Sequence, residues 1–127
     1  MGEHHVVGWK LDRQERDMLL ARFPPNWPDV DADHVTLQSH VAPDCPLPRA
    51  DSGQIVGWVN DGAGLQALVV RIDGATNRPD GGTYHITWSL DCGRGRRPVE
   101  SNDVLETQGW QPIDDPIPIR LIPARFG

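Results

Sequence analysis

Two short segments of the chain repeat one pattern: a histidine, an apolar residue, a threonine and a second apolar residue. The segments are residues 34–37 (HVTL) and residues 85–88 (HITW). Because alternate side chains of a β-strand point to opposite faces, the histidine and the threonine of each segment would share one face. The pattern therefore predicts two strands, each anchored in a core on one side and presenting an imidazole and a hydroxyl on the other.

The polar residues of the two segments form a chemically coherent set if the two strands face one cleft. Near neutral pH, His34 and His85 could work together as a general acid and a general base. The hydroxyls of Thr36 and Thr87 can donate hydrogen bonds to the non-bridging oxygens of a phosphate. One segment alone would be typical of a structural histidine, but its repetition favours acid–base chemistry on a phosphodiester.

The repeated His-x-Thr-x motif resembles that of the two-histidine (2H) phosphoesterase superfamily, which includes RNA 2′,3′-cyclic phosphodiesterases and the cyclic phosphodiesterase domains of some tRNA ligases. The resemblance covers roughly residues 5–122. It implies an α+β fold, a compact two-lobed domain in which two small, mostly antiparallel sheets flank a central cleft. It also implies that His34, Thr36, His85 and Thr87 are the catalytic residues of that cleft. The motifs lie 51 residues apart, closer than in larger members, so an element between them is expected to be trimmed.

The order of elements expected along the chain is richer in strand than in helix. One main helix over residues 13–22 is predicted by Asp12 at the N-cap, Glu15 three residues later and two prolines after Phe23. One short helix is expected within residues 98–105. A last strand is expected to lie at a sheet edge because Pro118 interrupts it. The strands are expected at residues 6–11, 33–41, 54–60, 65–72, 83–90 and 117–122.

Length and residue usage place limits on the class of protein. A chain of 127 residues fits one domain, taken as residues 1–127. No apolar stretch is long enough to cross a membrane, and Met1 to Leu11 lacks the pattern of a secretory signal, so a cytoplasmic location without membrane partners is expected. Cys45 and Cys92 have no CxxC spacing, so they predict neither a disulfide framework nor a zinc site.

The charge of the chain limits its partners to short nucleic acids. A net charge of −6 argues against binding to long duplexes, which basic surfaces usually perform. A local basic cluster follows the second motif, and it is either a substrate-binding patch or a solvated turn. Its members are Arg94, Arg96 and Arg97.

Two further polar residues share the strand parity of the motif histidines. His40 lies six residues after His34, and Ser89 lies four residues after His85. Both are candidate substrate-binding residues, provided that each strand stays regular that far. The alternative for His40 is that it lies beyond the regular part of its strand.

The function predicted from these residues is that of a metal-independent phosphodiesterase acting on 2′,3′-cyclic phosphate ends of RNA or nucleotides, as in RNA processing or repair. One neutral histidine would take a proton from water and the other, protonated, would donate a proton to the departing ribose oxygen. No metal or other cofactor is expected. Near-symmetric motifs leave open which histidine has which role, and the oligomeric state stays open too.

Two alternatives come from other classes of protein. The same cleft could bind RNA ends or nucleotides without turnover, although both motif histidines are intact. A metal-binding β-protein could use several of the five histidines, but no His-x-His spacing supports it.

Overall fold

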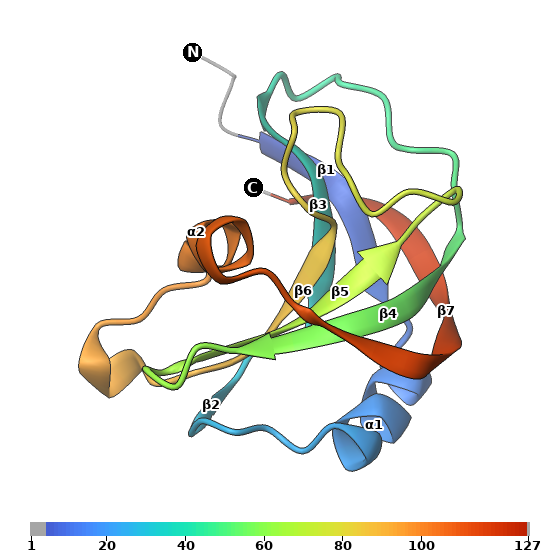
Figure 1. The fold of residues 1–127 in the computed structure, drawn as a ribbon. Helices are drawn as coiled ribbons and strands as arrows, with labels where there is room; N and C mark the ends of the chain where they lie inside the picture. The colour runs from blue at the N-terminus through green and yellow to red at the C-terminus, as the bar shows by residue number, and fades with distance from the viewer. Residues whose placement is uncertain (1–4, 127) are drawn as a thin grey trace.

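The computed structural model describes residues 5–126 (Figure 1). Residues 1–4, which begin the segment considered for a secretory signal, and residue 127 lie outside the described residues. The elements are β1 (His5–Leu11), α1 (Arg13–Arg22), β2 (Asp29–Val30), β3 (His34–Val41), β4 (Ser52–Asn60), β5 (Leu65–Arg71), β6 (His85–Leu90), the 3₁₀ turn η1 (Cys92–Arg94), α2 (Glu100–Gln108) and β7 (Gln111–Phe126).

The strands form one seven-stranded sheet in the order β2-β6-β5-β4-β7-β1-β3, and every neighbouring pair is antiparallel. Of the described residues, 48% lie in strands and 18% in helices. The prediction of a two-lobed α+β domain with two small sheets was therefore wrong. The reason is the length of β7, which pairs with β4 through its first part and with β1 through its last part. This strand joins what would otherwise be two separate sheets.

The position of β7 also corrects the prediction of an edge strand over residues 117–122. In the order of the sheet β7 is internal, yet its residues 111–112 and 117–120 pair only with β4 and its residues 121–126 only with β1. Each half therefore has one unpaired side. A proline, which lacks the backbone N–H, is tolerated where a strand has no partner to bond on that side. This explains how Pro118 and Pro123 fit inside the sheet order.

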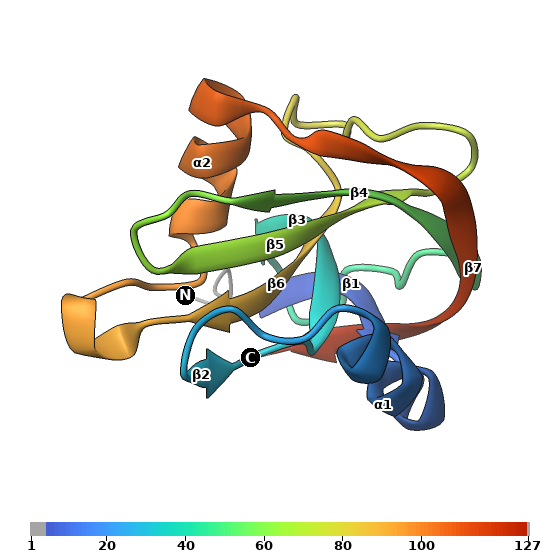
Figure 2. The same cartoon turned by 60° about the horizontal axis from the view of Figure 1, so that its bottom comes forward.

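The sheet curves so strongly that the motif strands β3 and β6 lie side by side, although they are far apart in the sheet order (Figures 1 and 2). The chain between β2 and β3 connects the two ends of the sheet. The backbone N–H of Ala32 donates to the carbonyl of Thr87 in β6, and the carbonyl of Asp33 accepts from Leu11 in β1. This short segment holds β3 against β6.

Apolar side chains fill both sides of the curved sheet. The larger cluster lies inside the curve, and α1 contributes Leu19 to it. The smaller cluster lies on the outer face, under Val104 and Leu105 of α2. Helix α1 has the predicted bounds, and the carboxylate of Asp12 accepts a hydrogen bond from the Glu15 N–H at 3.0 Å as the capping pattern predicted. The short predicted helix is α2, shifted by two to three residues.

Candidate functional site

The four motif side chains His34, Thr36, His85 and Thr87 line one pocket of about 220 Å³. Strand β3 supplies the first two and β6 the second two. Strand β3 also supplies Ser39, the loop before β6 supplies Arg78, and the turn into α2 with its first residues supplies Pro98, Val99 and Asn102. The structure thus brings both motifs to one place, at the junction where the ends of the curved sheet meet.

The alternation predicted for the motif strands is confirmed. Val35 and Ile86 are completely buried, at 0% exposure, inside the curved sheet. The polar partners point the other way, toward α2 and the pocket. His85 and Thr87 are 8% exposed, whereas His34 and Thr36 on the end strand are half-buried.

The ring of His85 is oriented by the backbone. Its Nδ1 lies 2.8 Å from the carbonyl oxygen of Thr83. Because a carbonyl oxygen only accepts, Nδ1 carries a hydrogen and Nε2 of the neutral ring is left with a free lone pair. The pKa of His85 is lowered to about 4, chiefly by burial and also by the positive charge of Arg78 and by the nearby His34, against the opposing effect of the Thr83 carbonyl. His85 is therefore neutral at pH 7.

The ring of His34 lies beside a carboxylate. Its Nδ1 is 3.1 Å from Oδ2 of Asp33, and the same carboxylate forms ion pairs with Lys10 at 2.7 Å and with Arg13 at 2.9 Å. Partial burial alone would raise the pKa of Asp33, but the hydrogen bonds from Lys10, Arg13 and His34 lower it to about 2. The carboxylate is therefore ionised at neutral pH and accepts a hydrogen bond from Nδ1. The ring of Phe126 packs against the same imidazole, with 4.8 Å between ring centroids.

The hydroxyl of Thr87 is held by the first turn of α2. Its Oγ1 lies 2.8 Å from Oγ of Ser101, which is completely buried. A hydroxyl has one hydrogen to donate and two lone pairs. The same Oγ1 lies 3.4 Å from the carbonyl oxygen of Pro98. Because a carbonyl oxygen only accepts, Thr87 donates to Pro98 and accepts from Ser101, so a ligand in the pocket would compete with Pro98 for the Thr87 hydrogen. Sequence reasoning missed Ser101, because nothing in the chain marks a serine at the start of α2 as a partner of β6.

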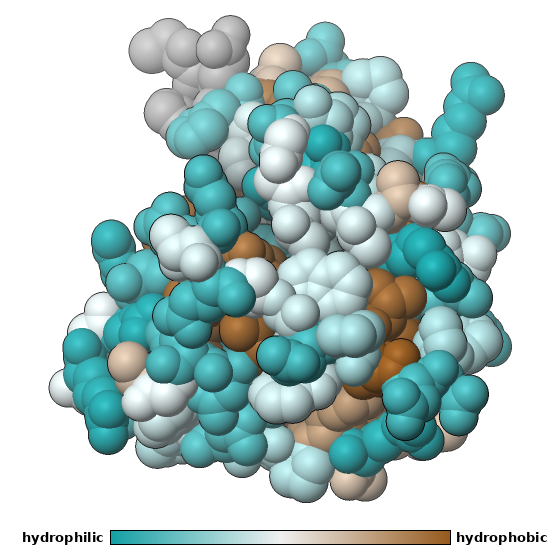
Figure 3. Space-filling view, in the orientation of Figure 1, coloured by the Kyte–Doolittle hydropathy of each residue, from teal (hydrophilic) through white to brown (hydrophobic). Residues whose placement is uncertain are grey.

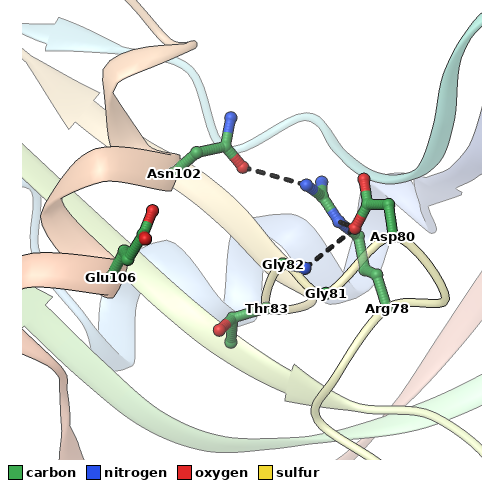
Figure 4. Close-up of a pocket in the computed structure, with 7 residues that line it drawn as sticks. All are labelled: Arg78, Asp80, Gly81, Gly82, Thr83, Asn102 and Glu106. Atoms are coloured by element: carbon green, nitrogen blue, oxygen red, sulfur yellow. Dashed lines mark hydrogen bonds and ion pairs between the residues drawn. The ribbon is translucent and has the colours of Figure 1, made fainter.

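Arg78 supplies a positive charge to the pocket that sequence reasoning also missed. Its side chain is only 10% exposed and is fixed by two partners (Figure 4). Nε lies 3.1 Å from Oδ1 of Asp80, and Nη2 donates to Oδ1 of Asn102 at 3.1 Å. The one available signal was position, since Arg78 begins the turn that leads into the second motif strand.

The structure does not bring His40 and Ser89 to the pocket, because a β-bulge intervenes in each strand. The register of β3 against β1 shifts twice after Thr36, so that Ser39 lines the pocket and His40 is exposed with a left-handed φ of 57°. The register of β6 against β5 shifts between Thr87 and Ser89, and Ser89 instead donates to Gln66 at 2.6 Å. In β6 the single bulge moves the side chain beyond it to the opposite face, whereas in β3 His40 lies within the second shift, where its left-handed backbone leaves the side chain exposed.

The three arginines that follow the second motif also lie outside the pocket. Arg94 pairs with Asp91 at 3.0 Å and stacks over the ring of Trp27. Arg96 pairs with Asp61 at 2.7 Å and with Glu100 at 3.3 Å, which pins the turn to α2. Arg97 is exposed and does not line the pocket. Of the two interpretations of this cluster, the solvated, ion-paired turn agrees with the geometry.

The surroundings of the pocket are predominantly polar. The face drawn in Figure 3, which carries α2 and the loop before β6, is mostly hydrophilic with small hydrophobic areas between polar side chains. In residues 5–126, no group of three or more His, Cys, Asp or Glu side chains is arranged to hold a metal ion. Within the same residues, neither helix is long and apolar enough to cross a membrane.

The chemical inventory of the site is one neutral imidazole with a free Nε2, a second imidazole beside an ionised carboxylate, three hydroxyls and one fixed guanidinium. These groups can move protons and can neutralise an anion. Comparisons of the chain with protein-family models, with curated proteins and with solved structures found no match. The resemblance to the two-histidine phosphoesterases therefore depends on the motif residues themselves.

Proposed function

We propose that the chain is a metal-independent phosphodiesterase of the two-histidine class that opens 2′,3′-cyclic phosphates of nucleotides or RNA ends. The observation that supports it most is the lining of one pocket by both motif histidines, both motif threonines and the buried Arg78. Such substrates arise in RNA processing and repair, and a cytoplasmic location is part of the proposal.

The environments of the two histidines suggest different roles for them. A general base must be neutral, and the low pKa of His85 together with the free lone pair on Nε2 suits it to that role. A general acid must carry a proton, and the negative charge of Asp33 lies beside the ring of His34, where it offsets the charge of an imidazolium. We assign His85 as the base and His34 as the acid.

In the proposed reaction, His85 takes a proton from water as the water oxygen forms a new bond to phosphorus. The bond from phosphorus to one ribose oxygen breaks, and His34 gives its proton to that oxygen. The hydroxyl of Thr36 donates to the remaining phosphate oxygens, the hydroxyl of Thr87 does so by exchanging the Pro98 carbonyl for a phosphate oxygen, and Arg78 offsets their negative charge. Such pre-oriented donors are usually the largest contribution to catalysis.

The test is turnover of uridine and guanosine 2′,3′-cyclic phosphate by protein treated with a chelator. We expect activity without metal, and we expect His34→Ala and His85→Ala each to reduce kcat/KM by about 10²–10⁴-fold, the usual contribution of one acid–base group. The double variant should lose less than the product of the two effects, because the pair acts as a unit.

The matched control is His40→Asn, an exposed histidine of the same strand that does not line the pocket. Asparagine tolerates the left-handed backbone of residue 40, so this variant should fold normally and keep the parental rate. Tight nucleotide binding without turnover would support the binding-module alternative. Activity that disappears with the chelator, or that survives in the double histidine variant, would contradict the proposal.

A further inference from the structure

A second hollow adjoins the pocket that contains the motif histidines. It has a volume of about 370 Å³ and lies between the turn of residues 78–83 and helix α2 (Figure 4). Arg78 and Asn102 line both hollows, so their hydrogen bond forms part of the wall between them. A volume of this size falls within the range of small-molecule sites, and a ligand held between the histidines would have a neighbouring space to enter.

Most polar groups of the wall already form hydrogen bonds or ion pairs with other groups of the protein. Oδ1 of Asp80 accepts from Arg78 and from the N–H of Gly82 at 2.8 Å. The amide of Asn102 accepts from Arg78 through Oδ1 and donates to the carbonyl of Val99 at 3.0 Å through Nδ2. These contacts hold the wall in place and leave few groups there to meet a ligand.

Glu106 is the exception on the helical side of the hollow. It lies four residues after Asn102, which places both on one face of α2, and this exposed residue lines the hollow. Among residues 5–126 its carboxylate has no hydrogen-bond or ion-pair partner, and Figure 4 shows it apart from the Arg78 network. An ionised carboxylate only accepts hydrogen bonds. The hollow therefore favours a ligand that presents N–H donors.

We propose that this hollow holds the base of the nucleotide whose phosphate lies between His34 and His85, and that Glu106 selects guanine. The proposal rests on the phosphodiesterase function proposed for the histidine pocket. Guanine carries an N1–H and a 2-amino group side by side, which match the two oxygens of a carboxylate in the way that the paired donors of an arginine do. The single N–H of uracil lies between two carbonyl oxygens, which a carboxylate repels. Single-stranded bases are commonly recognised on this edge.

The test is the binding of guanosine 3′-monophosphate and uridine 3′-monophosphate, measured by calorimetry, so that it does not depend on turnover. We expect the parent to bind the guanosine nucleotide about tenfold more tightly, the effect of hydrogen bonds to a charged but solvent-accessible group. Glu106→Gln should reduce the preference to about threefold or less, since an amide offers only one acceptor oxygen and adds a donor.

The matched control is Asp103→Asn, which makes the same change of charge at an exposed position of α2 that does not line the hollow. This variant should keep the parental preference, and circular dichroism of both variants should match that of the parent. Equal affinities of the parent for the two nucleotides, no binding of either, or an equal loss of preference in Asp103→Asn would overturn the base site. Preferential binding of the guanosine nucleotide without turnover of any cyclic phosphate would leave the base site standing and overturn the phosphodiesterase.

Discussion

The burial of His85 matters both for the folding of the protein and for the proposed chemistry. The strand alternation directs its imidazole away from the sheet interior, but α2 and the loop before β6 cover it. A buried imidazole avoids the cost of a buried charge by staying neutral. The same burial that fixes the ring therefore also keeps it in the unprotonated form that a general base needs.

Burial of His85 makes the stability of the protein depend on pH. The pKa of His85 is about 4 in the folded protein and 6.5 for the unperturbed side chain, so between these values the unfolded chain binds a proton that the folded protein does not. The free energy of unfolding should fall as pH drops from 6.5 to 4, by up to about 3 kcal/mol. The pKa of Asp33 is lowered to about 2, so its ionised carboxylate also stabilises the folded protein. This stabilisation is lost only as pH falls below 3.8, the usual pKa of an aspartate.

Urea unfolding of the parent and of His85→Asn at about pH 7.5 and about pH 4.5 tests this. These two values span most of the pH range over which His85 affects stability. Asparagine can still donate to the Thr83 carbonyl but does not titrate in this range. The variant should therefore lose distinctly less stability between the two pH values than the parent. The same loss in both proteins would show that other groups determine the acid sensitivity.

At the scale of elements, the close approach of β1 and β3 depends on a glycine. Gly8 pairs with Thr36, and a Cβ at residue 8 would clash with the carbonyl oxygen of Val35. The obstruction is backbone, which cannot rotate away as a side chain can. The position of His34 and Thr36 in the pocket therefore depends on the absence of a side chain on the neighbouring strand.

We expect Gly8→Ala to separate β1 from β3, to lower the free energy of unfolding by about 1–3 kcal/mol as overpacking does, and to reduce turnover. The control is Gly93→Ala in the exposed turn η1, where the nearest atom to the added methyl is the Asp91 carboxylate at 3.2 Å. That change should stay within about 0.5 kcal/mol of the parent. Chemical denaturation measures both. Equal stability of the two variants would mean that β3 accommodates the methyl group without displacement.

In the whole molecule, the two motif strands β6 and β3 have different numbers of neighbouring strands. Strand β6 has β2 and β5 on its two sides, whereas β3 lies at the end of the sheet order and pairs only with β1. His85 thus lies on an internal strand, although β2 pairs only with the far end of that strand, and His34 lies on an end strand; the register of both strands is interrupted by shifts. The site therefore combines one wall on an internal strand with one wall on an end strand that has a single partner.

Hydrogen exchange of the backbone amides should show that the end strand β3 is less protected than the middle of the sheet. Strand β5 lies between β6 and β4, and all of its residues except Arg71 are buried, so its amides should exchange last. The amides of β3 should exchange earlier, because local opening of an end strand breaks only one set of bonds. Mass spectrometry or NMR of the parent protein measures the order. Longer protection of β3 than of β5 would contradict the placement of β3 at the end of the sheet.

Several features of this protein were determined by its sequence alone, because they depend on neighbours within a few residues. The alternation of His34, Val35 and Thr36 determined which side chains enter the core, and Asp12 with Glu15 determined where α1 begins. The repeated motif likewise identified four of the side chains that line the pocket. Strand period and helix capping are local, so no knowledge of the fold was needed.

The tertiary structure decided everything that depends on which strands become neighbours. The single curved sheet results from the bending of β7 between two partners, which no local pattern encodes. Bulges in β3 and β6 moved His40 and Ser89 off the pocket face, and the packing of α2 against the loop before β6 brought in Arg78. The different environments of the two histidines arise in the same way, because burial and the position of Asp33 exist only once the chain has folded.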